Sequence, residues 1–133
     1  MRVVIDTNVL VSGLLSPHGA SAEIIRMVVA GSLDLLYDAR LLSEYTEVLS
    51  RPKFSFEKSN VDILMEFIGH YGIPVAATPL SVHLPDVDDE PFLEVAISGK
   101  AECLITGNTT HYPMRSRHKM RLLTPRQFIN RYY

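Results

Sequence analysis

Hydrophobic and polar positions follow one another along the chain in blocks that predict short strands and longer helices. The β-branched run Arg2–Ile5 predicts a strand buried on both faces. Apolar residues at Ile24, Ile25, Val28 and Val29 recur at helical spacing and predict a helix over residues 20–30. The same criteria predict strands at residues 33–37, 73–77, 102–106 and 122–123, and helices at residues 39–50, 56–71, 89–98 and from Pro125 onward.

The order of these elements predicts the fold class. Strands that alternate with helices indicate a three-layer α/β/α sandwich around a mainly parallel sheet of four to five strands. The length of 133 residues predicts a single domain over residues 1–133. In such sheets, ligands bind beyond the carboxyl ends of the strands. Polar residues that directly follow a strand are therefore candidates for a functional site.

The composition narrows the class of protein. With 47% hydrophobic and 21% charged residues, the chain has the composition of a globular domain. The single cysteine, Cys103, excludes a disulfide framework and a Cys-rich zinc site, and its place in a predicted strand indicates a core residue. No apolar stretch approaches the length of a membrane span. We therefore expect a cytoplasmic protein without a membrane partner.

The formal net charge of −2 hides two unlike parts. Residues 1–100 carry 7 basic and 14 acidic side chains, a net charge of −7. Residues 101–133 carry 6 basic side chains and one acid, a net charge of +5. This asymmetry is compatible with an acidic pocket beside a basic rim, and equally with charges scattered over a solvated surface.

Two acids fall at the predicted edge of the core. Asp6 ends the first strand, where it is either a cap of the next helix or a site residue. On a helical wheel of residues 39–50, Glu44 lies at the border of the apolar face, whereas Glu47 points to solvent. Glu44 is therefore either an ordinary boundary residue or an acid that reaches into a cleft.

A third acid comes from the cluster at residues 86–90. Acids in the first turn of a helix complement its dipole, which is their usual role. Asp89, however, projects on the same side as the apolar residues of the helix, whereas Glu90 and Glu94 are expected to point outward. Asp86 and Asp88 are interpreted as capping or solvated acids. Asn108 follows the strand 102–106 as Asp6 follows the first strand, although a turn residue after glycine is the alternative.

Three carboxylates at one sheet edge repel one another unless a cation neutralises them. Carboxylate oxygens suit hard ions such as Mg²⁺ or Mn²⁺, and such sites promote phosphodiester hydrolysis. The five histidines show no spacing typical of metal ligands, so we assign them no metal role.

Several segments in this order resemble a PIN-domain ribonuclease, and most closely the small stand-alone prokaryotic members that are toxins of toxin–antitoxin pairs (VapC-like). The resemblance covers nearly the whole chain. Its segments are VVIDTNVL at 3–10, LSEY at 42–45, LSRPKF at 49–54, DVDDEPFLEVA at 86–96, CLITGN at 103–108 and LTPRQF at 123–128.

The resemblance implies a Mg²⁺- or Mn²⁺-dependent endonuclease that acts on single-stranded RNA and leaves 5′-phosphate and 3′-hydroxyl ends. It implies catalytic and metal-binding roles for Asp6, Glu44 and Asp89, with Asn108 as a further ligand. Asn108 stands where the family usually has a fourth acid, and Thr110 replaces a further acid, which disfavours a second metal ion. The residues expected to support the site from behind are Thr7, Asn8 and Thr106.

The resemblance also suggests a role for the basic C-terminal part of the chain. Arg115, Arg117 and Lys119 are expected to contact the RNA backbone, although their alternation with uncharged residues equally fits a solvated edge. The resemblance further implies a cognate antitoxin protein that blocks the cleft, and a homodimer.

Three other classes of function compete with this hypothesis. With Asn108 and Thr110 in place of acids, the chain is alternatively a degenerate PIN scaffold that binds RNA or a protein without cutting. A phosphoacceptor domain would need an acceptor aspartate after a mid-chain strand, and a haloacid-dehalogenase-type phosphatase would need an acid at Asn8. The sequence provides neither.

Overall fold

The computed structural model describes all residues from Met1 to Tyr133 and contains one five-stranded sheet. All strand pairs are parallel, and the strand order is β3-β2-β1-β4-β5. The strands are β1 (Arg2–Ile5), β2 (Asp34–Tyr37), β3 (Ile73–Pro74), β4 (Cys103–Ile105) and β5 (Leu122–Leu123). The predicted fold class is confirmed.

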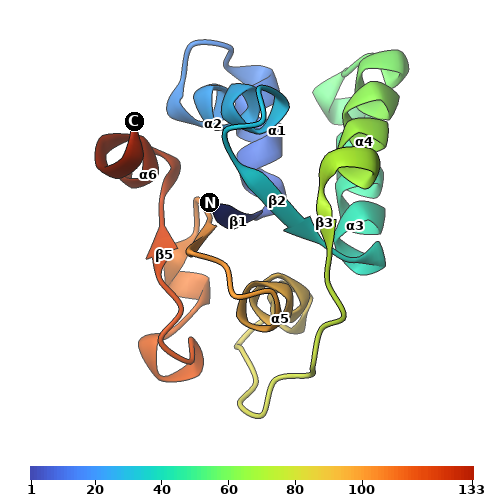
Figure 1. Cartoon of the computed structure of the whole chain (residues 1–133). Helices are drawn as coiled ribbons and strands as arrows, with labels where there is room; N and C mark the ends of the chain where they lie inside the picture. Colours follow the sequence, from blue (N-terminus) through green and yellow to red (C-terminus); the bar gives the residue numbers. More distant parts are fainter.

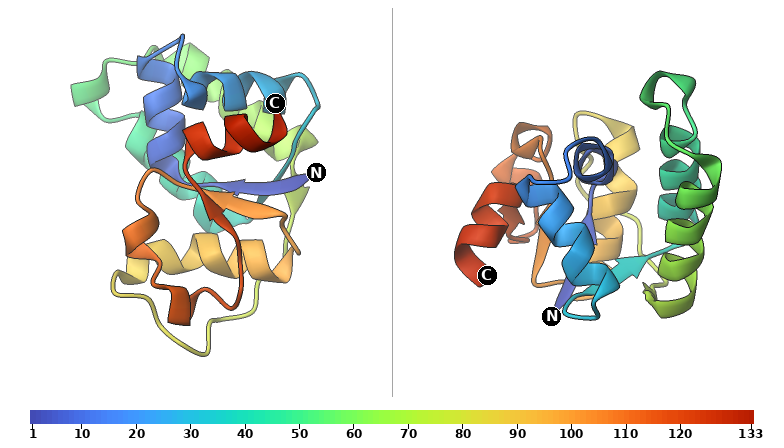
Figure 2. Two further views of the ribbon diagram at one scale, coloured as in Figure 1. Left: turned by 90° about the vertical axis from the view of Figure 1, so that its left-hand side faces the viewer. Right: turned by 90° about the horizontal axis from the view of Figure 1, so that it is seen from above.

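Helices cover both faces of this sheet. Figure 1 shows α5 on one side and α1 and α2 on the other, with the pair α3 and α4 beside the β3 end. The two further views show α6 packed near α2 (Figure 2). The helices are α1 (Thr7–Leu15), α2 (Ala20–Val29), α3 (Ala39–Leu49), α4 (Lys58–Tyr71), α5 (Glu90–Ser98) and α6 (Pro125–Tyr132). None of them combines the length and apolar character that crossing a membrane requires.

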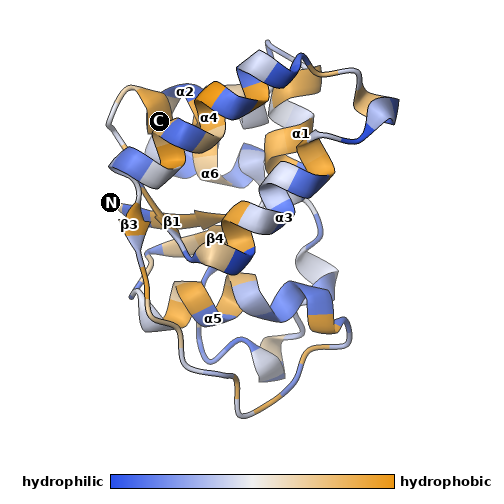
Figure 3. Ribbon diagram, turned by 90° about the vertical axis from the view of Figure 1, so that its right-hand side faces the viewer, coloured by the Kyte–Doolittle hydropathy of each residue, from blue (hydrophilic) through white to orange (hydrophobic).

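The centre of the core is formed by β1 and β4, whose hydrophobic side chains have almost no exposure. These strands are hydrophobic at the centre of the molecule in Figure 3. Cys103 of β4 is a core residue, as predicted, and burial raises the pKa of its thiol to about 12. Because Ile5 pairs with Ile105, the residues that follow them, Asp6 and Thr106, lie side by side at the carboxyl edge. From β1 the chain continues toward β2, and from β4 it continues toward β5, on the opposite side of the sheet. Ligand crevices in α/β sheets form at such a point.

The face of α5 that carries Glu90 and Glu94 is buried, whereas the sequence predicted that it is exposed. Glu90 and Glu94 do not point to solvent, because each has only 7% of its surface exposed. The segment between β3 and α5 folds back along the helix, and its backbone N–H groups at Leu84 and Leu80 donate to Glu90 and Glu94, both at 2.9 Å. The helical wheel was wrong here because it treats a helix as if solvent covered every side away from the sheet.

The Arg40 guanidinium forms an ion pair with the Glu94 carboxylate, with 2.7 Å between nitrogen and oxygen. It also pairs with Asp38 at the start of α3. Replacing Arg40 by Met should lower the free energy of unfolding by about 2 kcal/mol, because it leaves a buried carboxylate without its cation. Arg51→Met is the matched control, since Arg51 pairs with the exposed Glu47 and its loss should change stability little. Urea unfolding measures both, and equal effects would contradict a structural role for the Arg40 pair.

Candidate active site

Asp6 lies directly after β1 and has 6% of its surface exposed. One carboxylate oxygen accepts a hydrogen bond from the Thr7 N–H at 2.8 Å and so caps α1. The other accepts from the Thr106 hydroxyl at 2.8 Å and the Tyr112 hydroxyl at 3.2 Å. The residue therefore caps α1, which is one of the two interpretations of the sequence, and it is also a buried acid at the strand edge.

Glu44 is brought to the same edge by its neighbour on α3. The Tyr45 side chain is fully buried, and its hydroxyl donates to the Ile5 carbonyl at 2.5 Å, which fixes α3 against the end of β1. Glu44 stands half-buried beside this anchor, and its carboxylate accepts from the Thr7 hydroxyl. The Thr7 side chain thus contacts Glu44, and its backbone N–H contacts Asp6.

Asp89 approaches from the opposite layer. It ends the short turn Val87–Asp89 and is followed immediately by α5. Its side chain is 14% exposed and lies 3.2 Å from Nδ1 of His111. Its neighbours Asp86 and Asp88 are exposed, and Asp86 caps the turn by accepting from the Asp88 N–H, so their predicted capping or solvated role holds.

The three acids interact electrostatically. Burial raises the pKa of Asp6, although hydrogen bonds from Thr106 and Tyr112 partly offset the effect. Burial and then the charge of Asp6 raise the pKa of Glu44, against the hydrogen bond from Thr7. Burial, followed by the charge of Asp6, raises the pKa of Asp89 to about 6. Asp6 is thus the acid whose charge both others sense, which is typical of carboxylates that share one site.

This arrangement predicts a pH-dependent stability in the absence of divalent ions. The pKa of Asp89 is about 6 in the folded chain and near 3.8 in the unfolded chain. Below about pH 4 the carboxyl is protonated in the folded chain and does not disfavour folding. As the pH rises through 6 the carboxyl ionises, and the folded state loses stability relative to the unfolded one. Asp89→Asn should therefore be more stable than the native chain by about 1 kcal/mol at pH 7.5, after allowance for solvent screening. The difference should vanish near pH 4.

Urea unfolding in EDTA at the two pH values measures this difference. Asp88→Asn, which changes the exposed neighbouring acid, is the control and should behave as the native chain at both. A constant difference between Asp89→Asn and the native chain across the pH range would contradict the assigned shift.

Asn8 and Asn108 organise the neighbouring turn. The Asn8 side chain accepts from the Gly107 N–H at 3.0 Å and so ties the start of α1 to the segment after β4. The Asn108 N–H donates to the Thr106 hydroxyl at 3.0 Å, and its exposed side chain lines a hollow with Asn8 and Ser12. The three residues expected to support the site, Thr7, Asn8 and Thr106, all bind the acids or the turn beside them.

Tyr112 and His111 also contact these acids, and no pattern in the sequence pointed to them. Tyr112 is fully buried, and burial raises the pKa of its phenol, so the hydroxyl stays protonated and donates to Asp6. His111 contacts Asp89. Both follow β4 in an irregular turn, where neither periodicity nor spacing distinguishes a buried aromatic from a surface one. The guanidinium of Arg117 donates to the carbonyls of Tyr112 and Thr109, at 2.5 and 3.4 Å, and thereby holds this turn.

The donor set suits a hard divalent cation. It consists of three carboxylates whose pKa values are all raised. Burial raises each of them, and the charge of Asp6 further raises those of Glu44 and Asp89. Oxygen ligands with surplus negative charge favour Mg²⁺ or Mn²⁺. Each acid is turned toward a partner of its own, and no three His, Cys, Asp or Glu side chains form a ready-made metal cage.

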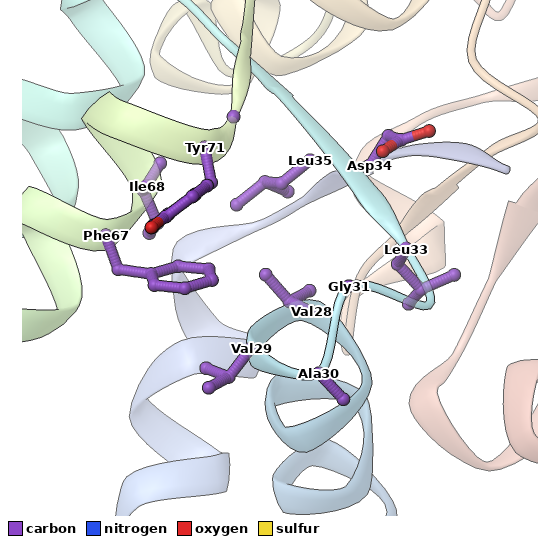
Figure 4. A pocket seen from close by; sticks show the side chains of 11 residues that line it. Val28, Val29, Ala30, Gly31, Leu33, Asp34, Leu35, Phe67, Ile68 and Tyr71 are labelled. Carbon is purple, nitrogen blue, oxygen red and sulfur yellow. The ribbon is translucent and has the colours of Figure 1, made fainter.

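Hollows surround the site on either side of α1. One, of about 560 Å³, lies between α1 and the α3 end and includes Thr7 and Glu44. A second, of about 520 Å³, lies between α1 and the starts of α2 and α6 and includes Asn108. A mostly apolar cavity of about 420 Å³ lies at the amino edge of β2, away from the acids, between α2 and α4 (Figure 4).

Known proteins resemble this chain in sequence and fold. Residues 2–110 match the PIN domain. An uncharacterized protein of Methanocaldococcus jannaschii is 25% identical over 143 residues, covering 99% of this chain and 92% of that protein. A chain in the crystal structure of VapBC2 from Rickettsia felis, bound to a DNA fragment from their promoter, has a similar fold. The TM-score is 0.57 at 13% identity, over 93% of this chain and 98% of that one.

The family match spans most of the chain and includes Asp6, Glu44, Asp89 and Asn108. PIN domains are in general metal-dependent nucleases. The likeness to the VapBC2 chain agrees with the same α/β fold. By the match over residues 2–110, this chain belongs to the PIN domain family.

Proposed function

We propose that this chain is a metal-dependent endoribonuclease that cleaves single-stranded RNA and leaves 5′-phosphate and 3′-hydroxyl ends. The observation that carries the proposal is the convergence of Asp6, Glu44 and Asp89, from three different segments, at the carboxyl edge of the sheet, with Asp6 raising the pKa of the other two. Buried acids that repel one another reduce stability and are typical of functional sites. Membership of the PIN domain family supports the same chemistry.

The proposed ligands of Mg²⁺ or Mn²⁺ are Asp6, Glu44 and Asp89, with the amide oxygen of Asn108 as a fourth. When bound, the ion supplies charge neutralisation at the attacked phosphodiester and makes a nearby water more acidic. The chain itself holds the carboxylates ready as acceptors. Thr106 and Tyr112 donate to Asp6, and Thr7 donates to Glu44, so the acids keep their orientation before any ion arrives.

The proposed RNA contacts lie on the basic segment after β4. Arg115 and Lys119 are exposed there, and we assign them contacts to the phosphate backbone. Arg117, although part of the same set, is half-buried and binds two backbone carbonyls, so its loss would affect the turn that carries Tyr112 as well as RNA affinity.

A partner protein belongs to the proposal. The fold is similar to a chain of a VapBC2 assembly, which supports a role as the toxin of a toxin–antitoxin pair. A cognate antitoxin would then inhibit by covering the acids, and a homodimer is the expected assembly. Co-expression with the neighbouring reading frame, followed by size-exclusion chromatography, tests both statements.

The activity is tested by cleavage of a single-stranded RNA with Mg²⁺ or Mn²⁺ and with EDTA. Glu44→Gln should reduce the rate at least about tenfold, because it removes one charge from the ligand set. Glu66→Gln removes an exposed acid from α4 and should leave the rate unchanged. Equal rates for the two variants, or cleavage that persists in EDTA, would contradict the proposal.

The exposed Asn108 supports a second candidate function. Because it brings no charge to the turn after β4, the chain is alternatively a PIN scaffold that binds RNA or a protein without cutting. Calorimetric titration with Mn²⁺ separates the two. Binding that disappears in Asp6→Ala supports the nuclease, whereas no binding at millimolar ion supports the scaffold.

A further inference from the structure

The hollow between α1 and the end of α3 is lined by one of the three acids, Glu44. Thr7 and Glu44 line it, and the same two side chains hydrogen-bond each other at the candidate site. Its volume of about 560 Å³ falls in the range of roughly 300–1,000 Å³ of pockets that bury small ligands. A molecule in this hollow would therefore touch the acidic edge directly.

Four of the side chains that line the hollow are apolar. They are Val11, Leu15, Val48 and Phe54. Leu15 is 53% exposed, which leaves apolar surface uncovered in the free chain. The Phe54 ring is held in place by Phe56, stacked at 5.6 Å between ring centroids, and by the Lys53 ammonium 5.0 Å from its centre.

A cation stands at the rim. Arg51 lines the hollow, and its guanidinium pairs with Glu47 at 2.8 Å on the helix surface. Both partners are exposed, so this pair is weak and exchanges readily for a phosphate. The hollow therefore combines apolar side chains, an exposed cation and a half-buried carboxylate.

We propose that this hollow is a subsite for one unstacked base of the RNA strand, with the attached phosphate at Arg51; the inference rests on the proposed function. Proteins that bind single-stranded RNA place splayed-out bases against aromatic and apolar side chains. An apolar helix of a partner protein would match only the apolar side chains of the hollow, whereas a nucleotide also supplies a phosphate for Arg51. Duplex RNA is excluded from the subsite, since its bases remain stacked inside the helix.

The test measures binding without cleavage. Fluorescence anisotropy in EDTA at low salt follows a labelled adenosine trimer and three trimers that each carry one abasic ribose. With the native chain, one of the abasic trimers should bind about tenfold more weakly than the intact trimer, the loss typical of one stacked base. The other two should lose less.

Two variants locate the effect. Phe54→Ala removes the aromatic side chain of the hollow, and Ser12→Trp fills the hollow from an exposed position. Both should bind the intact trimer about tenfold more weakly and no longer distinguish the abasic trimer. Tyr71→Ala is the control, because Tyr71 is an exposed aromatic at the remote cavity of Figure 4 and should bind as the native chain.

The outcomes separate this inference from the proposed function. Cleavage of RNA with metal, together with equal binding of all trimers by the native chain and the variants, would overturn the subsite and keep the nuclease. Abasic discrimination that depends on Phe54, without any metal-dependent cleavage, would keep the subsite and overturn the nuclease. A change of oligomeric state in Phe54→Ala or Ser12→Trp, without a change in RNA affinity, would make the hollow a chain–chain contact and overturn the inference.

Discussion

Asp6→Asn is expected to reduce metal-dependent RNA cleavage at least about 100-fold while the fold is retained. Asp6 is the acid whose charge both Glu44 and Asp89 sense, so its neutralisation removes the centre of the proposed ligand set. Loss of one charged group from a catalytic centre typically costs this much or more. Steady-state cleavage of a defined single-stranded RNA measures the effect.

The fold of this variant should survive because asparagine can satisfy the same partners. Its carbonyl oxygen can accept from the Thr7 N–H, and its amide can donate to the hydroxyl oxygens of Thr106 and Tyr112. Thermal unfolding of the metal-free variant is the control and should occur at or above the native midpoint, since the repulsion at the site is relieved. Unchanged cleavage by a folded Asp6→Asn would show that the activity belongs to another site or to a contaminant.

Gly72→Ala should lower the free energy of unfolding by about 2–4 kcal/mol, the range of severe packing errors. Gly72 joins α4 to β3, and a Cβ placed there would lie 2.5 Å from the Ile68 carbonyl oxygen and 3.0 Å from that of Leu35. Both obstacles are backbone atoms, which cannot move without opening the helix end or the sheet. The measurement is urea unfolding of the two chains.

Gly69→Ala, three residues earlier, should change stability in the opposite direction. A Cβ at Gly69 meets nothing within 4 Å, and the residue lies in the interior of α4. Alanine there should therefore stabilise the chain by about 0.5–1 kcal/mol through a better helix propensity. Effects of the same sign at the two positions would contradict the close approach at Gly72.

Much of the secondary structure could be predicted because its determinants are local. The β-branched run of β1, the apolar spacing of α2 and the Thr124–Pro125 start of α6 each depend on a few neighbouring residues. The structure adds a capping box between Thr124 and Gln127 at that start. The helix α1 received no separate prediction, because its residues are apolar on several sides and give little helical periodicity.

The candidate site was predictable only where a residue's position follows from the end of an element. Asp6 follows β1, and Glu44 borders the apolar face of α3, so both positions could be read from the pattern. Tyr112 could not, because it enters the core from an irregular turn. Its contact with Asp6 spans 106 residues, and no local pattern specifies such a contact.

The sequence by itself therefore determined most of the elements, their parallel α/β arrangement and the positions of Asp6 and Glu44 at the edge of the core, since these depend on propensity and periodicity along a short stretch. Only the tertiary structure decided which surfaces meet. It buried Glu90 and Glu94 beneath the returning segment and placed Tyr112 behind Asp6. It also formed the hollow beside Glu44. The physical reason is that burial and charge interaction depend on distance in space, which the spacing of residues along the chain does not fix.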